Sequence, residues 1–135
     1  MKRIAILASG EGTNAENIIR YFSERKTAKV VVVITNKAQA GVLNRADKLG
    51  IPTEFIPAQD FTEGRALEVL HRYQTDFIAL AGFLLRVPDD ILHDYPNKIV
   101  NIHPALLPKF GGKGMYGNRV HEAVIAAAEK ESGIT

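Results

Sequence analysis

Residues 3–14 read RIAILASGEGTN and join an apolar run to a glycine-rich turn. The run at residues 4–8 is continuously apolar, which predicts a strand buried on both faces of a parallel sheet. After the turn, Ala15, Ile18, Ile19 and Phe22 recur at helical spacing and predict a helix over residues 13–25. Strand, glycine turn and helix together predict the opening unit of an α/β fold.

The same alternation continues along the chain. We expect further strands at residues 30–35, 53–56, 77–81 and 99–102, and helices at residues 42–49, 62–73 and 88–93. The helix at 62–73 should carry Glu63 in its first turn, where an acid is favourable. A loop at 104–118 and a helix at 120–128 should follow. The pattern predicts a doubly wound, mostly parallel sheet, with ligands beyond the carboxyl ends of its strands.

Composition limits the classes of function. The chain has 135 residues, of which 46% are apolar, and this fits a single globular domain. A net charge of +2 gives no basic field that would favour nucleic acid or an anionic membrane. Cysteine is absent, which excludes disulfides and thiolate metal sites and suits a reducing cytoplasm. We expect a cytoplasmic domain that binds neither nucleic acid nor a membrane.

The glycine turn at residues 9–14 precedes a helix N-terminus, where backbone N–H groups favour a phosphate. Gly10, Gly12 and Ala15 also fit a variant of the dinucleotide fingerprint, but the ribose-binding acid expected about 20 residues later is absent from ITNK at 34–37. The GGKG segment at 111–114 lacks the Ser or Thr of a Walker loop. The turn alone leaves a phosphate site, a turn without ligand and a dinucleotide site open.

Asn101 and His103 flank Ile102 where the last expected strand runs into NIHPALLP, residues 101–108. In extended backbone their side chains would share one face, about 7 Å apart. An amide donor beside a titratable imidazole suits acyl-type transfer, because an oxyanion must be stabilised and a proton moved. The alternative is a strand-end cap with locally satisfied hydrogen bonds. Ser9 and Ser132 lack the context of a hydrolase nucleophile.

The other histidines carry weaker signals. His71 and His93 have no partner at ligand spacing, and the chain contains neither thiolates nor an HExxH pattern. We therefore expect no metal. His121 opens the helix after the glycine-rich loop, where we favour a role at the solvated helix start over a role in the site.

With these motifs in view, the sequence resembles the phosphoribosylglycinamide formyltransferase family, folate-dependent enzymes of purine synthesis. The resemblance covers all 135 residues and is carried by ILASGEGTN, ITNKAQAGVLNRADKLGIPT, LAGFLLRVP and NIHPALLPKFGGKGMYG. NIHPALLP is the most specific of these segments. The resemblance implies a Rossmann-like formyltransferase fold, with 10-formyltetrahydrofolate as co-substrate and glycinamide ribonucleotide as acceptor.

The resemblance also implies roles for individual residues. Gly12, Thr13 and Asn14 would hold the phosphate of the ribonucleotide through backbone amides. Asn101 would position and polarise the formyl oxygen. His103 would donate a proton, as imidazolium, to the oxyanion formed when the amine attacks.

The folate would bind at the loop after the fourth strand. The residues implied there are Leu84, Leu85, Arg86 and Val87, together with Asn101. Their backbone groups would pair with the pterin edge, and Leu85 and Val87 would supply apolar walls.

Two features depart from the family pattern. The family carries an aspartate in a D-E-G-D-like stretch that raises the pKa of the histidine, and residues 1–135 contain no such stretch. We therefore expect a single formyltransferase domain at 1–135 that is truncated at its C-terminus, with a sheet edge that favours a homodimer. Asn118 and Arg119 stand where the family often has a histidine. Alternatives are a catalytically incomplete binding module for phosphate and folate and, less favoured, an NAD-dependent oxidoreductase.

Overall fold

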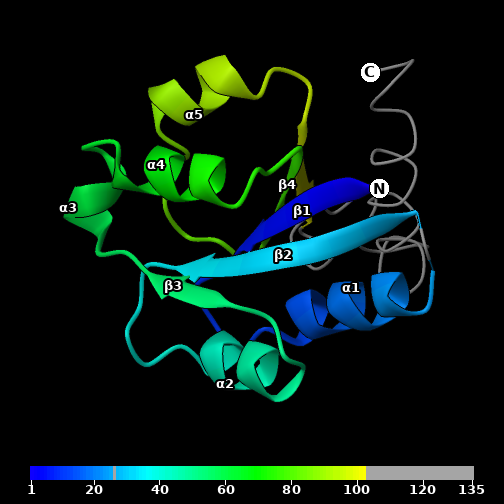
Figure 1. Cartoon of the computed structure of the whole chain (residues 1–135). Helices are drawn as coiled ribbons and strands as arrows, with labels where there is room; N and C mark the ends of the chain where they lie inside the picture. Colours follow the sequence, from blue (N-terminus) through cyan, green and yellow to red (C-terminus); the bar gives the residue numbers. More distant parts are fainter. Residues whose placement is uncertain (26, 103–135) are drawn as a thin grey trace, which may run out of the picture.

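A single parallel sheet forms the centre of the molecule (Figure 1). The computed structural model describes residues 1–25 and 27–102. The five strands are β1 Lys2–Leu7, β2 Ala28–Thr35, β3 Thr53–Phe55, β4 Phe77–Ala81 and β5 Ile99–Ile102. Their order across the sheet is β3-β2-β1-β4-β5, and every neighbouring pair is parallel. The predicted sheet is confirmed, with strand ends within two residues of those expected.

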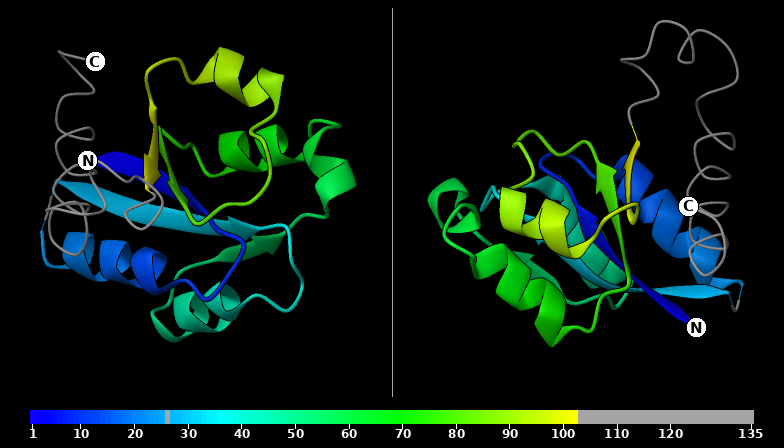
Figure 2. Two further views of the ribbon diagram at one scale, coloured as in Figure 1. Left: turned by 180° about the vertical axis from the view of Figure 1, so that it is seen from behind. Right: turned by 90° about the horizontal axis from the view of Figure 1, so that it is seen from above.

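Helices cover both faces of this sheet (Figures 1 and 2). They are α1 Thr13–Ser23, α2 Gly41–Lys48, α3 Ala58–Phe61, α4 Arg65–Arg72 and α5 Asp89–Asp94. One face packs against α1 and α2, and the other packs against α3, α4 and α5. In β1, Ile4 and Ile6 belong to the first core, while Ala5 and Leu7 belong to the second. The doubly wound architecture is thereby confirmed, because helices follow successive strands onto both faces.

The stripe expected on α1 is the one the fold buries. Ala15, Ile18, Ile19 and Phe22 are at most 4% exposed and pack against the sheet. The helix ends at Ser23, two residues before the predicted end. Its apolar face fixes the N-terminus of α1 directly after the glycine turn.

The single helix expected at residues 62–73 was wrong. A short helix, α3, forms earlier and is anchored by Phe61, which is 1% exposed. Gly64 then adopts φ 91°, a left-handed conformation that interrupts the helix, and α4 begins at the next residue. Glu63 consequently lies in the turn, and the acid in the first turn of α4 is Glu68.

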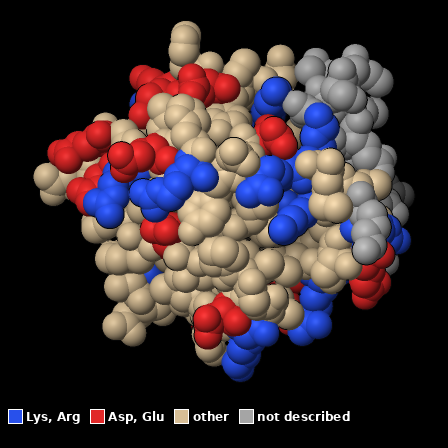
Figure 3. All heavy atoms as spheres, in the orientation of Figure 1, with Lys and Arg blue, Asp and Glu red and all other residues tan. Residues whose placement is uncertain are grey.

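Charged side chains of both signs occupy the face shown in Figure 3, and the acidic ones gather near α3 and α5. Over residues 1–25 and 27–102, no helix is long and apolar enough to cross a membrane. The predicted loop at 104–118, the predicted helix at 120–128 and His121 lie outside the residues that the structure describes.

Candidate functional site

The carboxyl ends of β1 and β4 form the centre of the candidate site. The chain order reverses between these two neighbouring strands, since β2 and β3 lie on one side and β5 lies on the other. In open α/β sheets this reversal creates a crevice in which ligands bind. The glycine turn at residues 9–14 follows β1, and the segment LLRV at residues 84–87, called the LLRV loop below, follows β4. The expected phosphate site and the expected folate site therefore both lie at this point.

The turn after β1 is shaped by Gly12. This residue has φ 85° and caps α1, whose N-terminus receives no side-chain cap. A Cβ atom at Gly12 would lie 2.6 Å from the Cβ atom of Val42, so a side chain is excluded by sterics as well as by conformation. The first-turn N–H groups, including those of Thr13 and Asn14, have no acceptor within the helix. The turn therefore offers the geometry of an anion site.

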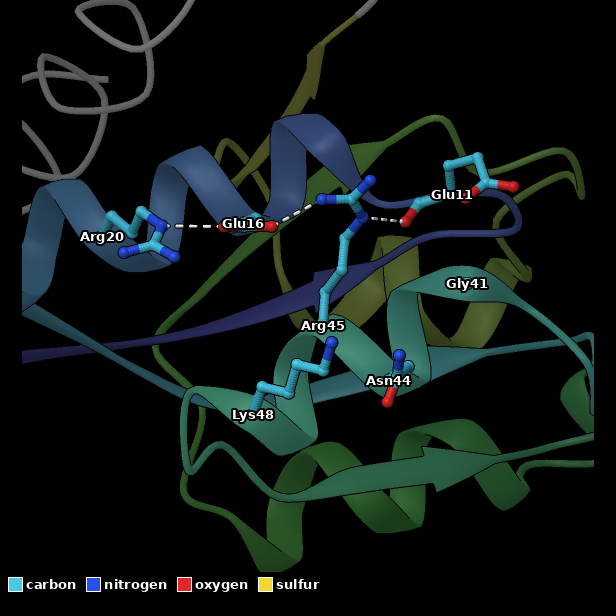
Figure 4. Close-up of a pocket in the computed structure, with 7 residues that line it drawn as sticks. All are labelled: Glu11, Glu16, Arg20, Gly41, Asn44, Arg45 and Lys48. Carbon is cyan, nitrogen blue, oxygen red and sulfur yellow. Dashed lines mark hydrogen bonds and ion pairs between the residues drawn. The ribbon is translucent and has the colours of Figure 1, made fainter.

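Two hydrogen bonds from Val42 and Arg45 of helix α2, together called the brace below, hold this turn in place. The backbone N–H of Val42 donates to the carbonyl oxygen of Gly10 at 3.0 Å. Arg45 donates from Nε to the carbonyl oxygen of Glu11 at 2.7 Å (Figure 4). These bonds hold two successive carbonyl groups of the turn against one helix. Sequence reasoning missed this brace, because Arg45 lies 34 residues from Glu11.

A cavity of about 390 Å³ lies between α1 and α2 next to the brace. Figure 4 shows the residues that line it, which are Glu11, Glu16, Arg20, Gly41, Asn44, Arg45 and Lys48. Glu16 accepts hydrogen bonds from Arg20 at 2.8 Å and from Arg45 at 2.6 Å. The bonds from Arg20 and then Arg45 lower the pKa of Glu16. We interpret this cavity as a structural feature beside the α2 contacts and not as a ligand site, because both arginines that line it already pair with Glu16.

Ser9 joins the two halves of the site. Its hydroxyl donates to Oδ1 of Asn36 at 2.6 Å and accepts from the backbone N–H of Leu84 at 2.9 Å. Its own N–H donates to the carbonyl oxygen of Gly82 at 3.1 Å. Ser9 itself is 4% exposed, and its two side-chain hydrogen bonds are partly buried. The sequence offered one signal for this role, a serine directly after a buried strand.

Asn36 occupies the region where a dinucleotide-binding domain would place its ribose-binding acid. The structure engages the side-chain oxygen of Asn36 with the hydroxyl of Ser9. The position therefore supplies a structural hydrogen bond, and it carries no carboxylate for a ribose.

The loop after β4 exposes one apolar side chain. Leu84 is 72% exposed, whereas Val87 is 9% exposed and packs in the core beneath α3, α4 and α5. Leu85 is partly buried against the same core, and Phe83 is 6% exposed within it. The expected apolar wall at Val87 is therefore a core side chain in the structure. Leu84 offers the most exposed apolar side chain of this loop to a ligand, and Leu85 is partly exposed beside it.

Arg86 extends into solvent beside this loop. Its guanidinium lies 3.3 Å from the carboxylate of Asp89, and both side chains are more than 80% exposed. A hollow of about 530 Å³ adjoins the pair and is lined by Thr62, Glu63, Gly64, Arg86, Val87, Pro88, Asp89 and Asp90. An ion pair this exposed contributes little to stability, so Arg86 is available to other partners.

Asn101 lies at the end of β5, exposed and in register with the site. Leu7 of β1 pairs with Leu80 of β4, and Leu80 pairs with Asn101. Two strand spacings separate the Cα atoms of Leu7 and Asn101 by about 10 Å. Asn101 shares its sheet face with Ile99, two residues earlier on the strand, which packs against the core of α4 and α5.

The remaining predicted site residue, His103, lies outside the described residues. His71 Nε2 is 2.7 Å from Asp94 Oδ2 on the surface, away from the strand ends. Within the described part of the chain, no three residues among His, Cys, Asp and Glu gather as metal ligands would. The residues brought together are thus the glycine turn, the LLRV loop and Asn101.

Comparison with known proteins places this geometry in context. A family model described as formyl transferase matches residues 2–135. A phosphoribosylglycinamide formyltransferase of Bacillus subtilis is 35% identical, and the alignment covers the whole chain and 70% of the relative. A chloroplastic phosphoribosylglycinamide formyltransferase of Arabidopsis thaliana is 38% identical over 99% of the chain and 48% of the relative.

Solved structures agree with these relatives. The crystal structure of glycinamide ribonucleotide transformylase 1 from Symbiobacterium toebii matches with a TM-score of 0.74 and 36% identity. The match covers 82% of this chain and 55% of that chain. The chain thus spans about half the length of several proteins it resembles.

Proposed function

The chain belongs to the formyl transferase family, and we propose that its site serves formyl transfer from 10-formyltetrahydrofolate to the amine of glycinamide ribonucleotide. The names of the relatives support transfer of a formyl group to phosphoribosylglycinamide, and the folate donor is what the resemblance to the formyltransferase family implies. The uncapped N-terminus of α1 supports an acceptor that carries a phosphate. We assign the two substrates to the two sides of the junction between β1 and β4.

The phosphate half comprises the backbone amides of Gly12, Thr13 and Asn14. Thr13 is exposed and Gly12 and Asn14 are partly buried, so a phosphate has access to the first turn of α1. The helix dipole adds a favourable potential for an anion at this end. A cationic side chain is not required, because the backbone N–H groups donate hydrogen bonds and the helix N-terminus carries a partial positive charge.

The folate half comprises residues Leu84, Leu85, Arg86 and Val87. Backbone N–H and C=O groups of this loop would pair with the pterin, while the exposed side chain of Leu84 would cover one of its faces. Val87 would contribute through its backbone, since its side chain packs in the core.

Asn101 and His103 are the residues to which we assign the catalytic steps. The acceptor amine attacks the formyl carbon, and the carbonyl oxygen gains negative charge that the Asn101 amide stabilises as a hydrogen-bond donor. His103, as imidazolium, lends a proton to this oxygen and recovers it when the intermediate collapses. The bond from carbon to N10 of the folate then breaks, and the proton released by the amine ends on N10.

One observation carries this proposal. An uncapped helix N-terminus and the LLRV loop open side by side at the switch point of the sheet, with Asn101 in register on the next strand. This arrangement lets an anionic acceptor and a flat donor approach each other above β4. We also propose a reducing compartment such as the cytoplasm, supported by the absence of cysteine.

The test is an assay for formylglycinamide ribonucleotide, with titrations of each substrate. Asn101→Ala should lower turnover by about 100-fold, as loss of one oxyanion donor does. Asn17→Ala is the matched control on the exposed surface of α1 and should leave turnover unchanged. Failure of the unmodified chain to bind either substrate would contradict the proposal.

Two further outcomes separate the alternatives. Binding of both substrates without product would favour a binding module, and the catalytic roles of Asn101 and His103 would then be wrong for this chain. Binding of NAD with no binding of the ribonucleotide would favour an oxidoreductase. His103→Ala should also lower turnover by about 100-fold or more, and because His103 is assigned only to proton transfer, binding of both substrates should stay intact.

A further inference from the structure

Ser9 belongs by sequence to the glycine turn, but its hydroxyl contacts other segments. The hydroxyl donates its proton to Asn36 after β2 and accepts the backbone N–H of Leu84 after β4. A serine hydroxyl has one proton and two lone pairs, so the bond to Asn36 orients a lone pair toward Leu84. Ser9 therefore fixes the first residue of the LLRV loop across a separation of 75 residues.

The glycine turn does not depend on this hydroxyl. Its carbonyl groups at Gly10 and Glu11 accept bonds from Val42 and Arg45 of α2. Its conformation is set by φ 85° at Gly12, which packs directly against Val42. Loss of the Ser9 hydroxyl would leave each of these contacts in place.

The start of the LLRV loop at Leu84 is held by fewer contacts than the glycine turn. The Leu84 side chain is 72% exposed and adds little packing of its own. The neighbouring Gly82 carbonyl is bonded to the Ser9 backbone, which a side-chain substitution does not remove. The hydroxyl of Ser9 is thus the side-chain group that positions the Leu84 N–H.

We propose that Ser9 is a positioning residue for the folate half of the site, although it lies in the phosphate motif. This inference rests on the proposed function, because it assumes that the LLRV loop binds the folate. The segment SGEGTN at residues 9–14 then has two separate tasks. Residues 12–14 serve the phosphate, and Ser9 serves the co-substrate on the neighbouring strand.

The test compares the two affinities in one variant. Ser9→Ala should weaken binding of 10-formyltetrahydrofolate by about tenfold, the effect of one lost hydrogen bond at a preorganised loop. Affinity for glycinamide ribonucleotide should stay within about twofold of the unmodified chain. A general loss of folded protein would weaken both apparent affinities together, so the split distinguishes positioning from stability.

Two variants complete the comparison. Ser9→Thr keeps the hydroxyl and should restore folate affinity to within about threefold. Ser23→Ala removes a hydroxyl that donates to the carbonyl oxygen of Arg20 on the exposed end of α1, and it should change neither affinity. Equal weakening of both ligands by Ser9→Ala, or an unchanged folate affinity, would overturn the proposal.

If Ser9→Ala does not fold, Asn36→Ala provides the second route. It removes the acceptor that orients the hydroxyl and should weaken folate binding alone, by about threefold. If the unmodified chain binds neither substrate, the proposed function fails, and amide exchange still decides the role of Ser9. Exchange of the Leu84 N–H should then accelerate about tenfold in Ser9→Ala, and unchanged exchange would contradict the role.

Discussion

The glycine turn after β1 and the LLRV loop after β4 lie side by side, but different forces hold them. The turn is fixed by backbone conformation at Gly12 and by two bonds from α2 to its carbonyl groups. The loop is held at one end by the Ser9 hydroxyl and at the other by the buried side chain of Val87. Adjacent half-sites can therefore be perturbed separately, which gives each proposed substrate its own set of sensitive residues.

The largest expected effect is at Gly12. Gly12→Ala should lower the free energy of unfolding by about 2 to 4 kcal/mol, because a left-handed alanine is strained and its Cβ would overlap Val42. Ribonucleotide affinity should fall with it, while folate affinity per folded molecule should stay within about twofold. Gly10→Ala is the matched control, since a Cβ there meets nothing within 4 Å. Urea unfolding of both variants measures the difference, and equal losses would contradict the steric argument.

Arg45 offers a smaller change to the same half. Arg45→Gln removes the bond to Glu11 and the ion pair to Glu16, and should weaken ribonucleotide binding by about threefold to tenfold. The cost in stability should be about 0.5 to 1 kcal/mol, because the side chain is partly exposed. Arg65→Gln breaks an exposed 3.8 Å ion pair with Asp60 and serves as the control. Calorimetric titration should show unchanged folate binding, and a matching loss of folate affinity would remove the separation between the halves.

The smallest expected effect is the dependence of stability on pH that arises from Glu16, which pairs with Arg45 of the brace. The pKa of Glu16 is lowered by its bonds from Arg20 and Arg45, so its contribution to stability is present above its unfolded pKa. That contribution is lost as the pH falls through the lower, folded pKa. The unmodified chain should thus lose more stability than Glu16→Gln on acidification below about pH 4.5. Thermal unfolding across that range tests this, and parallel curves would show that Glu16 does not stabilise the brace.

Local patterns in the sequence predicted most of the fold. The continuous apolar run of β1 and the stripe of Ala15, Ile18, Ile19 and Phe22 depend on periodicity, and both are buried as expected. The interruption at Gly64 was missed because apolar spacing continues across it from Phe61 to Leu70. Periodicity reports which side chains are buried, but it does not report backbone conformation at a single residue.

The site was less predictable than the fold for a physical reason. The glycine turn and Asn101 could be placed at strand ends from sequence, since parallel strands share one edge. The partners of Ser9 and Arg45 could not, because they lie 27 to 75 residues away and depend on strand order. The burial of Val87 likewise depends on how α5 packs, which its neighbours in sequence do not specify.

The most direct test of two separately held half-sites is to map amide chemical shifts in the unmodified chain as each substrate is added. Glycinamide ribonucleotide should shift the amides of Gly12, Thr13 and Asn14, and 10-formyltetrahydrofolate should shift those of residues 84–87. The two sets should be distinct, with Ser9 responding to the folate. Shifts that coincide for both ligands, or that occur away from the ends of β1 and β4, would contradict the account.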